Sequence, residues 1–238
     1  MRVVVIGGSG RLGQLIVQRC RASNDAVVSV GRSDSLHSLI GDGVDTVVVD
    51  VASAGSSAHH AAVCVDLRVP LLVGTTGLSA AEFKALDDAS SSIAVLVAAN
   101  LSPGAHLVAL LSATAARAMA DADVEIVEVH HRKKKDAPSG TALMLAHAVE
   151  QARGSARIIK SRQGEALRQL GDIGVVAVRG GDVVGEHTVT FFVDGERVEI
   201  AHKVSDRGIF AKGAVLAARF LVGAAAGRYQ MTDVLASV

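Results

Sequence analysis

Proton donors and positive charges gather in the stretch from Val124 to Ala142. The stretch opens with the β-branched residues and spaced carboxylates that are typical of a half-buried strand. His130 and His131 follow where that strand should end, and the cations from Arg132 to Lys135 come directly after them. The next residues have the turn and cap chemistry that starts a helix: Asp136, Pro138, Ser139 and Gly140. Imidazoles, amines and an anion-binding helix end therefore meet at one point, which predicts a site for a small carboxylate.

Taken one at a time, these residues have ordinary structural explanations. A basic loop is usually a solvated surface, and a histidine in a strand is more often structural than catalytic. Their combination favours chemistry, and His130 is the candidate acid because imidazole titrates near neutral pH. The spacing alone does not choose among Lys133, Lys134 and Lys135 as a second donor.

A glycine-rich turn near the N-terminus has the spacing of a dinucleotide-binding site. Arg2 to Ile6 is a short apolar strand, and a helix is expected over Gln14 to Arg21. The turn between them contains both G-x-G-x-x-G and G-x-x-G-x-x-G and consists of Gly7, Gly8, Ser9, Gly10, Arg11, Leu12 and Gly13. Glycine lets the backbone approach a pyrophosphate, and the helix N-terminus presents N–H groups to its charge. An ordinary βα turn is the alternative, but the position between strand and helix favours cofactor binding.

The end of the second expected strand, over 26–30, bears on the choice of cofactor. A NAD-preferring site usually has an acidic residue there, whereas this chain has Gly31, Arg32 and Ser33, with Asp34 slightly late. Arg32 is suited to the 2′-phosphate of NADP. We therefore expect NADPH to be preferred, with NADH as the second cofactor. If Arg32 is merely exposed, both cofactors should serve.

Three further strands, expected over 45–51, 70–73 and 93–98, alternate with helices over 57–65 and 81–90. Two loops follow such strands and are candidate cofactor contacts, because ligands bind at the carboxyl ends of parallel strands. Their residues are Gly74, Thr75, Thr76, Ala98, Ala99, Asn100 and Leu101. The alternative is simple turn chemistry. His59, His60 and Cys64 lie on the helix expected over 57–65 and do not have the spacing of metal ligands, so no metal site is expected.

Composition excludes several classes of function. The formal net charge is +0 and only 3% of residues are aromatic, so neither nucleic acid nor a membrane surface is expected as a partner. Cys20 and Cys64 lack C-x-x-C spacing, which fits a reducing compartment. The N-terminus does not resemble a signal peptide, and the apolar run over 214–226 falls short of the ~20 residues of a membrane span. We expect a soluble, cytoplasmic protein.

The regular alternation of strands and helices stops near residue 101. A long helix is expected over 103–119 and leads into the strand that carries His130. A polar loop over 155–171 comes next, and then closely spaced strands over 174–179, 187–193 and 197–204. This part predicts an α+β unit on one sheet, and a helix over 214–223 should return to the first half.

The motif H-H-x-x-K-x-D-A-P-S-G-T-A, from His130 to Ala142, closely resembles the signature of the dihydrodipicolinate reductases of bacterial lysine biosynthesis, also called 4-hydroxy-tetrahydrodipicolinate reductases. G-T-T-G at 74–77, A-A-N-x-S at 98–102 and R-x-G-D-x-V-G-E-H-T at 179–188 extend the resemblance along the chain. The chain departs from the family at Gly31, where an acidic residue is common, at Leu101, where phenylalanine is common, and after Asp50, where Phe-Thr is usual.

The resemblance implies a fold and an activity. The fold is α/β: an N-terminal Rossmann-type, doubly wound parallel sheet with a second α+β domain on a mixed sheet. The dinucleotide-binding domain would span 1–101 and 208–238, and 102–207 would bind substrate and assemble a homotetramer. The implied reaction is the NAD(P)H-dependent reduction of a cyclic dicarboxylate to tetrahydrodipicolinate. Among the lysines the resemblance selects Lys134 as a second proton donor, with His131, Gly140 and Thr141 as substrate contacts.

Two other interpretations stay open on the sequence. Another two-domain NAD(P)-dependent amino- or keto-acid dehydrogenase would keep the glycine turn without needing the histidine–lysine motif. A non-catalytic NADP(H)-sensing protein would bind the cofactor without oxidising it in the presence of a dicarboxylate. A nucleic-acid module using the Arg–Lys run is disfavoured further, and salt-dependent binding of oligonucleotides is its test.

Overall fold

The computed structural model describes residues 1–31, 34–41 and 43–237. The chain divides into two compact units. The first unit joins Met1–Pro103 to Gly208–Val238, and the second is Gly104–Arg207.

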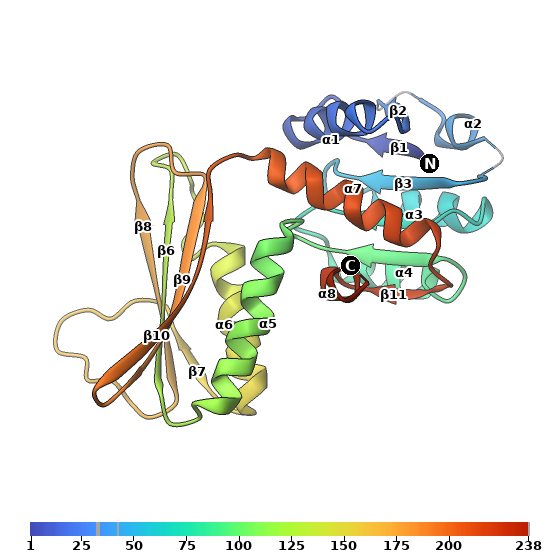
Figure 1. Cartoon of the computed structure of the whole chain (residues 1–238). Coiled ribbons are helices and arrows are strands. Elements are labelled where there is room, and N and C mark those ends of the chain that lie inside the picture. Colours follow the sequence, from blue (N-terminus) through green and yellow to red (C-terminus); the bar gives the residue numbers. More distant parts are fainter. Residues whose placement is uncertain (32–33, 42, 238) are drawn as a thin grey trace. The chain divides into compact units, whose positions relative to one another are not determined.

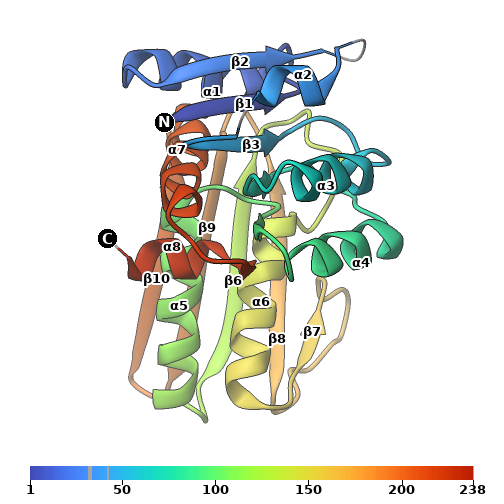
Figure 2. The same cartoon turned by 90° about the vertical axis from the view of Figure 1, so that its right-hand side faces the viewer.

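A parallel six-stranded sheet forms the first unit, with the strand order β11-β5-β4-β3-β1-β2 over the described residues. Its strands are β1 (Arg2–Ile6), β2 (Ala26–Val30), β3 (Thr46–Asp50), β4 (Leu71–Val73), β5 (Ala94–Val97) and β11 (Gly227–Tyr229). Its helices are α1 (Arg11–Ala22), α2 (Leu36–Ile40), α3 (Ser57–Asp66), α4 (Ala80–Ala89), α7 (Gly208–Val222) and α8 (Met231–Ala236). In Figure 2, α3 and α4 lie on one side of the strands and α7 and α8 on the other.

Continuous apolar strands form because both faces of this sheet are covered. Val3 and Val5 of β1 pack into the core shared with α1, α7 and α8, whereas Val4 and Ile6 pack into the core shared with α2, α3 and α4. This is the doubly wound architecture that the sequence predicts, and the prediction is confirmed. The short elements α2, β11 and α8 were not expected.

Helix α7, with which the chain returns to the first unit, packs tightly onto the loop that follows β5. A Cβ atom on Gly213 would lie 1.7 Å from the carbonyl oxygen of Leu101, so only glycine allows this approach. Leu101 itself is buried in the core beside α7. The returning segment therefore fixes one of the strand-end loops that we expect to contact the cofactor.

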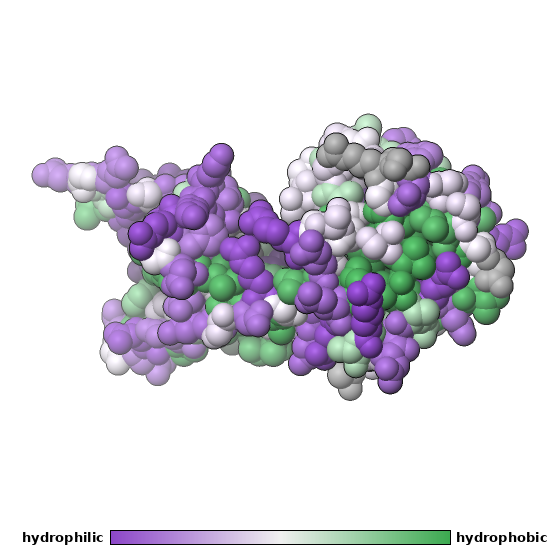
Figure 3. All heavy atoms as spheres, turned by 90° about the horizontal axis from the view of Figure 1, so that it is seen from above, coloured by the Kyte–Doolittle hydropathy of each residue, from purple (hydrophilic) through white to green (hydrophobic). Residues whose placement is uncertain are grey.

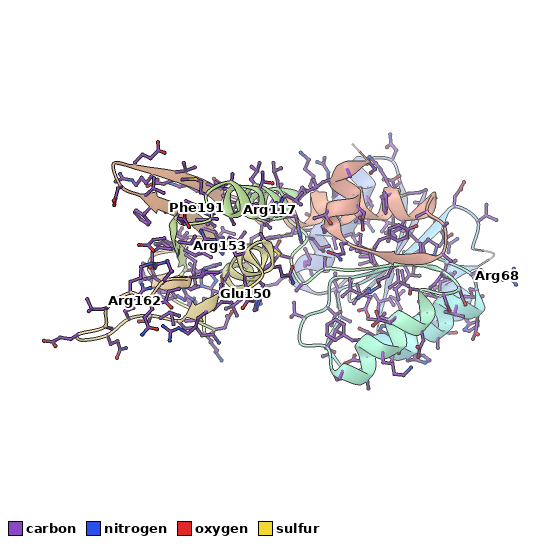
Figure 4. The ribbon with its side chains drawn as sticks, turned by 90° about the horizontal axis from the view of Figure 1, so that it is seen from below. Arg68, Arg117, Glu150, Arg153, Arg162 and Phe191 are labelled. Atoms are coloured by element: carbon purple, nitrogen blue, oxygen red, sulfur yellow. The ribbon has the colours of Figure 1, made fainter. Side chains whose placement is uncertain are left out.

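The second unit is a mixed five-stranded sheet with the order β10-β9-β6-β8-β7 over the described residues, which confirms the predicted α+β domain. Its strands are β6 (Asp123–His130), β7 (Arg157–Ile159), β8 (Asp172–Arg179), β9 (Gly185–Val193) and β10 (Glu196–Val204). The helices α5 (Pro103–Ala118) and α6 (Gly140–Arg153) lie side by side against one face (Figure 1). Phe191 of β9 is fully buried between sheet and helices (Figure 4).

The other face of this sheet exposes apolar side chains. Val127, Val176, Val178 and Phe192 are each about two-fifths exposed, at 39%, 41%, 42% and 39%. The strand register puts Val127 beside Val176 and leaves both on the face opposite α5 and α6. We call this surface the open sheet face.

The polar loop expected over 155–171 contains the short strand β7, which pairs with β8, and residues 160–171 lack regular structure. It projects from the second unit, and its surface is mainly hydrophilic (Figures 1 and 3). Arg162 lies near its base (Figure 4), and Arg162 and Arg168 donate to the same oxygen of Glu125 over 2.6 and 2.5 Å. Leu167 and Leu170 are almost fully exposed, at 96% and 93%.

Candidate active site

The carboxylate of Glu128 is the centre of the polar cluster in the second unit. On the helix-facing side of β6, Val124 and Ile126 enter the core, and Glu128 and His130 follow at the same two-residue spacing. Glu128 is fully buried and accepts from Nδ1 of His130 over 2.5 Å. It also accepts from both terminal nitrogens of Arg179, over 2.8 Å each, and from the backbone N–H of Ser139 over 3.0 Å.

These contacts decide the charges of the cluster. Burial raises the pKa of Glu128, but the hydrogen bonds from Arg179, His130 and Ser139 outweigh it and hold that pKa below its usual value. Burial lowers the pKa of His130, as do the charges of Lys134 and Arg179, whereas Glu128 raises it; the net direction is downward. Glu128 is therefore an anion, and it is the group that supports a positive charge on His130.

His187 of β9 packs edge-on against His130, with ring centroids 5.2 Å apart. Its Nε2 lies 3.1 Å from Oγ of Ser139, and its Nδ1 has no hydrogen-bond partner in the described part of the chain. Burial, and next the charge of His130, lower the pKa of His187 to about 4. His187 is therefore neutral at pH 7 and adds no repulsion to a protonated His130.

Backbone hydrogen bonds hold the basic loop, both within it and to the turn between β8 and β9. The N–H of His131 donates to Val183 O over 2.8 Å, and the N–H of Lys134 donates to His131 O over 3.0 Å. Nζ of Lys134 pairs with Asp136 at 2.9 Å, and Lys134 is half-buried, whereas Lys133 and Lys135 are exposed. The hydrogen bond from Lys134 lowers the pKa of Asp136. Of the three lysines, Lys134 is the one that the fold fixes near His130.

Helix α6 begins at Gly140 and offers its N-terminus beside this cluster. Ser139 is the N-cap, and its Oγ accepts from the N–H of Ala142 over 3.1 Å. The first turn itself holds no acidic residue, and the one carboxylate bonded at the cap, Glu128, accepts from the N–H of Ser139 and pairs with Arg179. Gly140 is exposed and Thr141 is half-buried. This helix end can receive a carboxylate.

The glycine turn of the first unit has the close backbone contacts that a pyrophosphate site requires. A Cβ atom on Gly13 would lie 2.2 Å from the carbonyl oxygen of Gly7, and one on Gly8 would lie 2.1 Å from Oγ of Ser29. Gly7 has a φ of +82°, which favours glycine. The N-terminus of α1 at Gly10 has no side-chain cap and no acidic residue in its first turn. The turn therefore fits a dinucleotide, whose phosphates would meet the free end of α1.

A buried carboxylate also organises the strand-end loops of the first unit. Asp50, at the end of β3, accepts from Oγ of Ser57 over 2.7 Å and from Oγ1 of Thr75 over 2.9 Å, and it lies 2.9 Å from Nδ1 of His60. Burial raises the pKa of Asp50, but the hydrogen bonds of His60, Ser57 and Ala52 N–H hold that pKa below its usual value. His60 is thus satisfied by Asp50, and no group of three potential metal ligands occurs in the described residues.

The residues of the strand-end loops, which are expected to contact the cofactor, differ in their solvent exposure. Thr76 is exposed and Gly74 half-buried, whereas the side chain of Thr75 is turned inward to Asp50. Leu101 is only 3% exposed, so a ligand would meet its backbone rather than its side chain. Arg32 lies outside the described residues.

Comparison with known proteins identifies the chain. A family model described as "Dihydrodipicolinate reductase, N-terminus" matches residues 1–101, and one described as "Dihydrodipicolinate reductase, C-terminus" matches residues 104–235. This chain belongs to the dihydrodipicolinate reductase family.

Individual members of the family match over nearly the whole chain. A 4-hydroxy-tetrahydrodipicolinate reductase of Nitrosospira multiformis is 40% identical, with 99% of this chain and 97% of the relative covered. The enzyme of that name from Myxococcus xanthus is 41% identical, with 97% and 88% covered. Among solved structures, a dipicolinate-bound dihydrodipicolinate reductase from Paenisporosarcina sp. TG-14 has the same fold, with a TM-score of 0.79, 22% identity and 97% of each chain covered. No described helix is long and apolar enough to cross a membrane.

Sequence reasoning did not assign a catalytic or binding role to the residues of the two polar networks, which are Asp50 and His60 in the first unit and Glu128, Arg179, Gly185 and His187 in the second. Two signals were present. Glu128 stands two residues before His130 on one face of a strand, and the R-x-G-D-x-V-G-E-H-T motif contains Arg179, Gly185 and His187. The contact between Glu128 and Arg179 spans 51 residues of sequence, which a local pattern does not reveal.

Proposed function

We propose that this chain catalyses the NAD(P)H-dependent reduction of 4-hydroxy-tetrahydrodipicolinate to tetrahydrodipicolinate, in the diaminopimelate route of lysine biosynthesis. The observation that carries the proposal is the identity of about two residues in five with reductases of this name over nearly the full chain. The polar cluster around His130 and the N-terminus of α6 supply the chemistry that this reaction needs from the protein.

The cofactor would be held by the glycine turn and the strand-end loops of the first unit. When bound, a reduced nicotinamide supplies the hydride. The residues of the turn are Gly7, Gly8, Ser9, Gly10, Arg11, Leu12 and Gly13, and those of the loops are Gly74, Thr75, Thr76, Ala98, Ala99, Asn100 and Leu101. Support comes from the close contacts within the turn and from the Asp50 network, which fixes the loop that carries Thr75.

Protons would be supplied by two side chains of the second unit. His130, held by Glu128 through Nδ1, would donate from Nε2, and the ammonium group of Lys134 would donate or stabilise charge at the ring nitrogen of the substrate. The hydrogen bond between Lys134 and Asp136 would have to open or be shared for Nζ to reach the substrate. Lys134 is the one half-buried lysine of the three, and this supports the choice.

The substrate would be a small dicarboxylate. One carboxylate would meet the backbone N–H groups of Gly140 and Thr141 at the start of α6, and His131 would hold the ring or the second carboxylate. The reductase from Paenisporosarcina is described as dipicolinate-bound, and dipicolinate is a ring with two carboxylates. The positive end of the α6 dipole, whose first turn holds no acidic residue, fits that charge.

NADPH would be preferred over NADH. At the end of β2, Gly31 stands where a ribose-binding acid would be, and Oδ2 of Asp34 accepts from the N–H of Gly31 over 2.7 Å. The first carboxylate after the strand is therefore engaged with the backbone. Arg32 is the residue that we assign to the 2′-phosphate on its chemical type. A kcat/KM ratio in favour of NADH would reject this assignment.

The chain would assemble as a homotetramer, with the open sheet face buried between copies. Val127, Val176, Val178 and Phe192 give this face the apolar character of an interface core. Sedimentation of the purified protein measures the assembly, and a monomer at micromolar concentration would reject it. Both cysteines are free and buried, which supports a cytoplasmic location.

The decisive experiment couples the purified protein to a dihydrodipicolinate synthase and follows NADPH absorbance. His130→Ala and Lys134→Ala should each lower kcat/KM by about 10²-fold or more, the usual scale of lost acid–base help. Lys133→Ala is the matched control and should keep turnover, because Lys133 is exposed. Cofactor binding without any turnover by the wild-type protein would instead indicate an NADP(H)-sensing protein.

A further inference from the structure

We propose that Glu128 is a positioning residue that fixes the tautomer and orientation of His130 for proton donation. The inference rests on the proposed function, because it concerns how His130 acts in that reaction. It assigns to Glu128 a role beyond that of an internal ion pair with Arg179.

Four hydrogen bonds fix the position of the Glu128 carboxylate. Its Oε2 accepts from His130 Nδ1 and Arg179 Nη1, and its Oε1 accepts from Arg179 Nη2 and the N–H of Ser139. The carboxylate is fully buried and is placed from three directions, by β6, β8 and the cap of α6. It therefore ties the orientation of the His130 ring to the start of the helix that we assign to the substrate carboxylate.

The same geometry decides which nitrogen of His130 exchanges its proton. An ionised carboxylate only accepts hydrogen bonds, so Nδ1 must carry a proton. Nε2 is then the nitrogen that gains and loses the second proton. A Cβ atom on Gly185 would lie 3.0 Å from Nε2, so glycine at this position leaves that side of the ring free of a side chain.

The charge of Glu128 also sets when His130 is protonated. The charged or titratable groups that act on His130 are Glu128 on its own strand, Lys134 in the basic loop, Arg179 on β8 and the neighbouring His187 on β9. Burial and the two cations lower the pKa of His130, and Glu128 alone among these groups raises it. Removal of the carboxylate charge should therefore make the acid form harder to populate near neutral pH.

Glu128→Gln tests the proposal, because it keeps the shape of the side chain and removes its charge. In the coupled assay the variant should lose about 10²-fold in kcat/KM, and the fall of kcat/KM at alkaline pH should move to lower pH. The sign follows because the reaction needs protonated His130, whose pKa drops when the carboxylate charge is lost. NADPH affinity, measured by fluorescence titration, should be unchanged.

Glu150→Gln is the matched control. Glu150 of α6 (Figure 4) pairs with His147 over 2.8 Å, so this variant also removes a carboxylate from a histidine, but ten residues along the helix from Gly140. It should leave kcat/KM and its pH profile unchanged. If Glu128→Gln has wild-type kcat/KM and an unmoved alkaline limb, Glu128 is only part of a structural ion pair and the inference is overturned.

A measurement on the wild-type protein covers the case in which the variant does not fold. The ¹⁵N spectrum of the histidine-labelled protein, with His130 assigned from the His130→Ala spectrum, should show His130 protonated at Nδ1 when the ring is neutral. A neutral ring protonated at Nε2, or an averaged tautomer, would overturn the inference. If the wild-type protein does not turn over substrate at all, the proposed function fails, whereas this NMR result stands on its own.

Discussion

The buried His187 should make the folded state sensitive to acid. In the native protein its pKa is lowered to about 4, chiefly by burial, from the value of 6.5 that an exposed histidine has. Between these two pH values the unfolded chain binds a proton at this position that the folded chain does not bind. Stability is therefore lost as pH falls from 6.5 towards 4, and the full contribution is present above 6.5.

The expected size of this effect follows from the difference between the two pKa values. Each tenfold difference in proton affinity is worth about 1.4 kcal/mol, so His187 should cost about 3 kcal/mol of the free energy of unfolding by pH 4. The residue is only 4% exposed, so solvent screening removes little of this energy. Buried carboxylates with lowered pKa values, such as Asp50 and Glu128, also lose stability in acid, so a variant is needed to isolate the histidine.

His187→Gln is that variant, because glutamine is neutral throughout and can donate to Oγ of Ser139 in place of the ring. Urea unfolding of both proteins at equal subunit concentration, followed by circular dichroism, gives the free energy of unfolding at each pH. The wild-type value minus the variant value should fall by about 3 kcal/mol between pH 7 and pH 4. His147→Gln, at an exposed histidine of α6, is the control.

One outcome contradicts this reasoning directly. If the difference between wild type and His187→Gln is the same at pH 7 and pH 4, the proton affinity of His187 does not change on folding. The buried position of the ring would then not control its charge, and the neutrality that we assign to it beside His130 would lose its basis.

Two predictions concern glycines that leave room for the site. Gly13→Ala puts a methyl group 2.2 Å from Gly7 O, so NADPH should bind about tenfold more weakly or worse in a fluorescence titration. Gly223→Ala is the control, because its added methyl group meets no atom within 4 Å, and it should bind NADPH like wild type. Equal NADPH affinities of Gly13→Ala and Gly223→Ala would contradict the fit of the turn to a dinucleotide. Gly185→Ala puts a methyl group 3.0 Å from Nε2 of His130 and should lower kcat about tenfold with NADPH affinity retained. Gly180→Ala is the control, because its methyl group meets nothing within 4 Å, and its kcat should equal that of wild type. A wild-type kcat for Gly185→Ala would contradict the need for free space beside the His130 ring.

Long apolar and glycine-rich patterns made the wound half predictable. The inner strands β1 and β3 are covered on both faces, so each contains a continuous apolar run that stands out in the sequence. The glycines of the first turn are required by contacts within one short segment, and such local constraints appear directly as spacing. The elements that were missed are short ones, such as the three-residue strands β7 and β11, which exist only through pairing with β8 and β5.

The polar networks could not be predicted in the same way. Asp50 follows a buried strand in the sequence, but its partners Ser57, His60 and Thr75 come from a helix and from the next strand end. His60 was interpreted as a surface or satisfied residue, without its partner. Only the arrangement of β3, α3 and β4 shows that one buried carboxylate collects them. The sequence gives the residue types, whereas the charge balance depends on distances in the fold.

The polarity change along β6 separates the core from the site. Val124 and Ile126 face the helices as ordinary core residues, and two and four positions later the same face carries Glu128 and His130. A buried ion pair is a poor source of stability, because well-packed apolar residues in its place are often neutral or better. Stability therefore does not account for Glu128 and Arg179 at the end of an otherwise apolar face. The contacts of Glu128 to His130 and to the cap of α6 account for the pair. The His130 ring and the start of α6 must keep fixed positions if one is to donate a proton while the other binds a carboxylate of the same substrate.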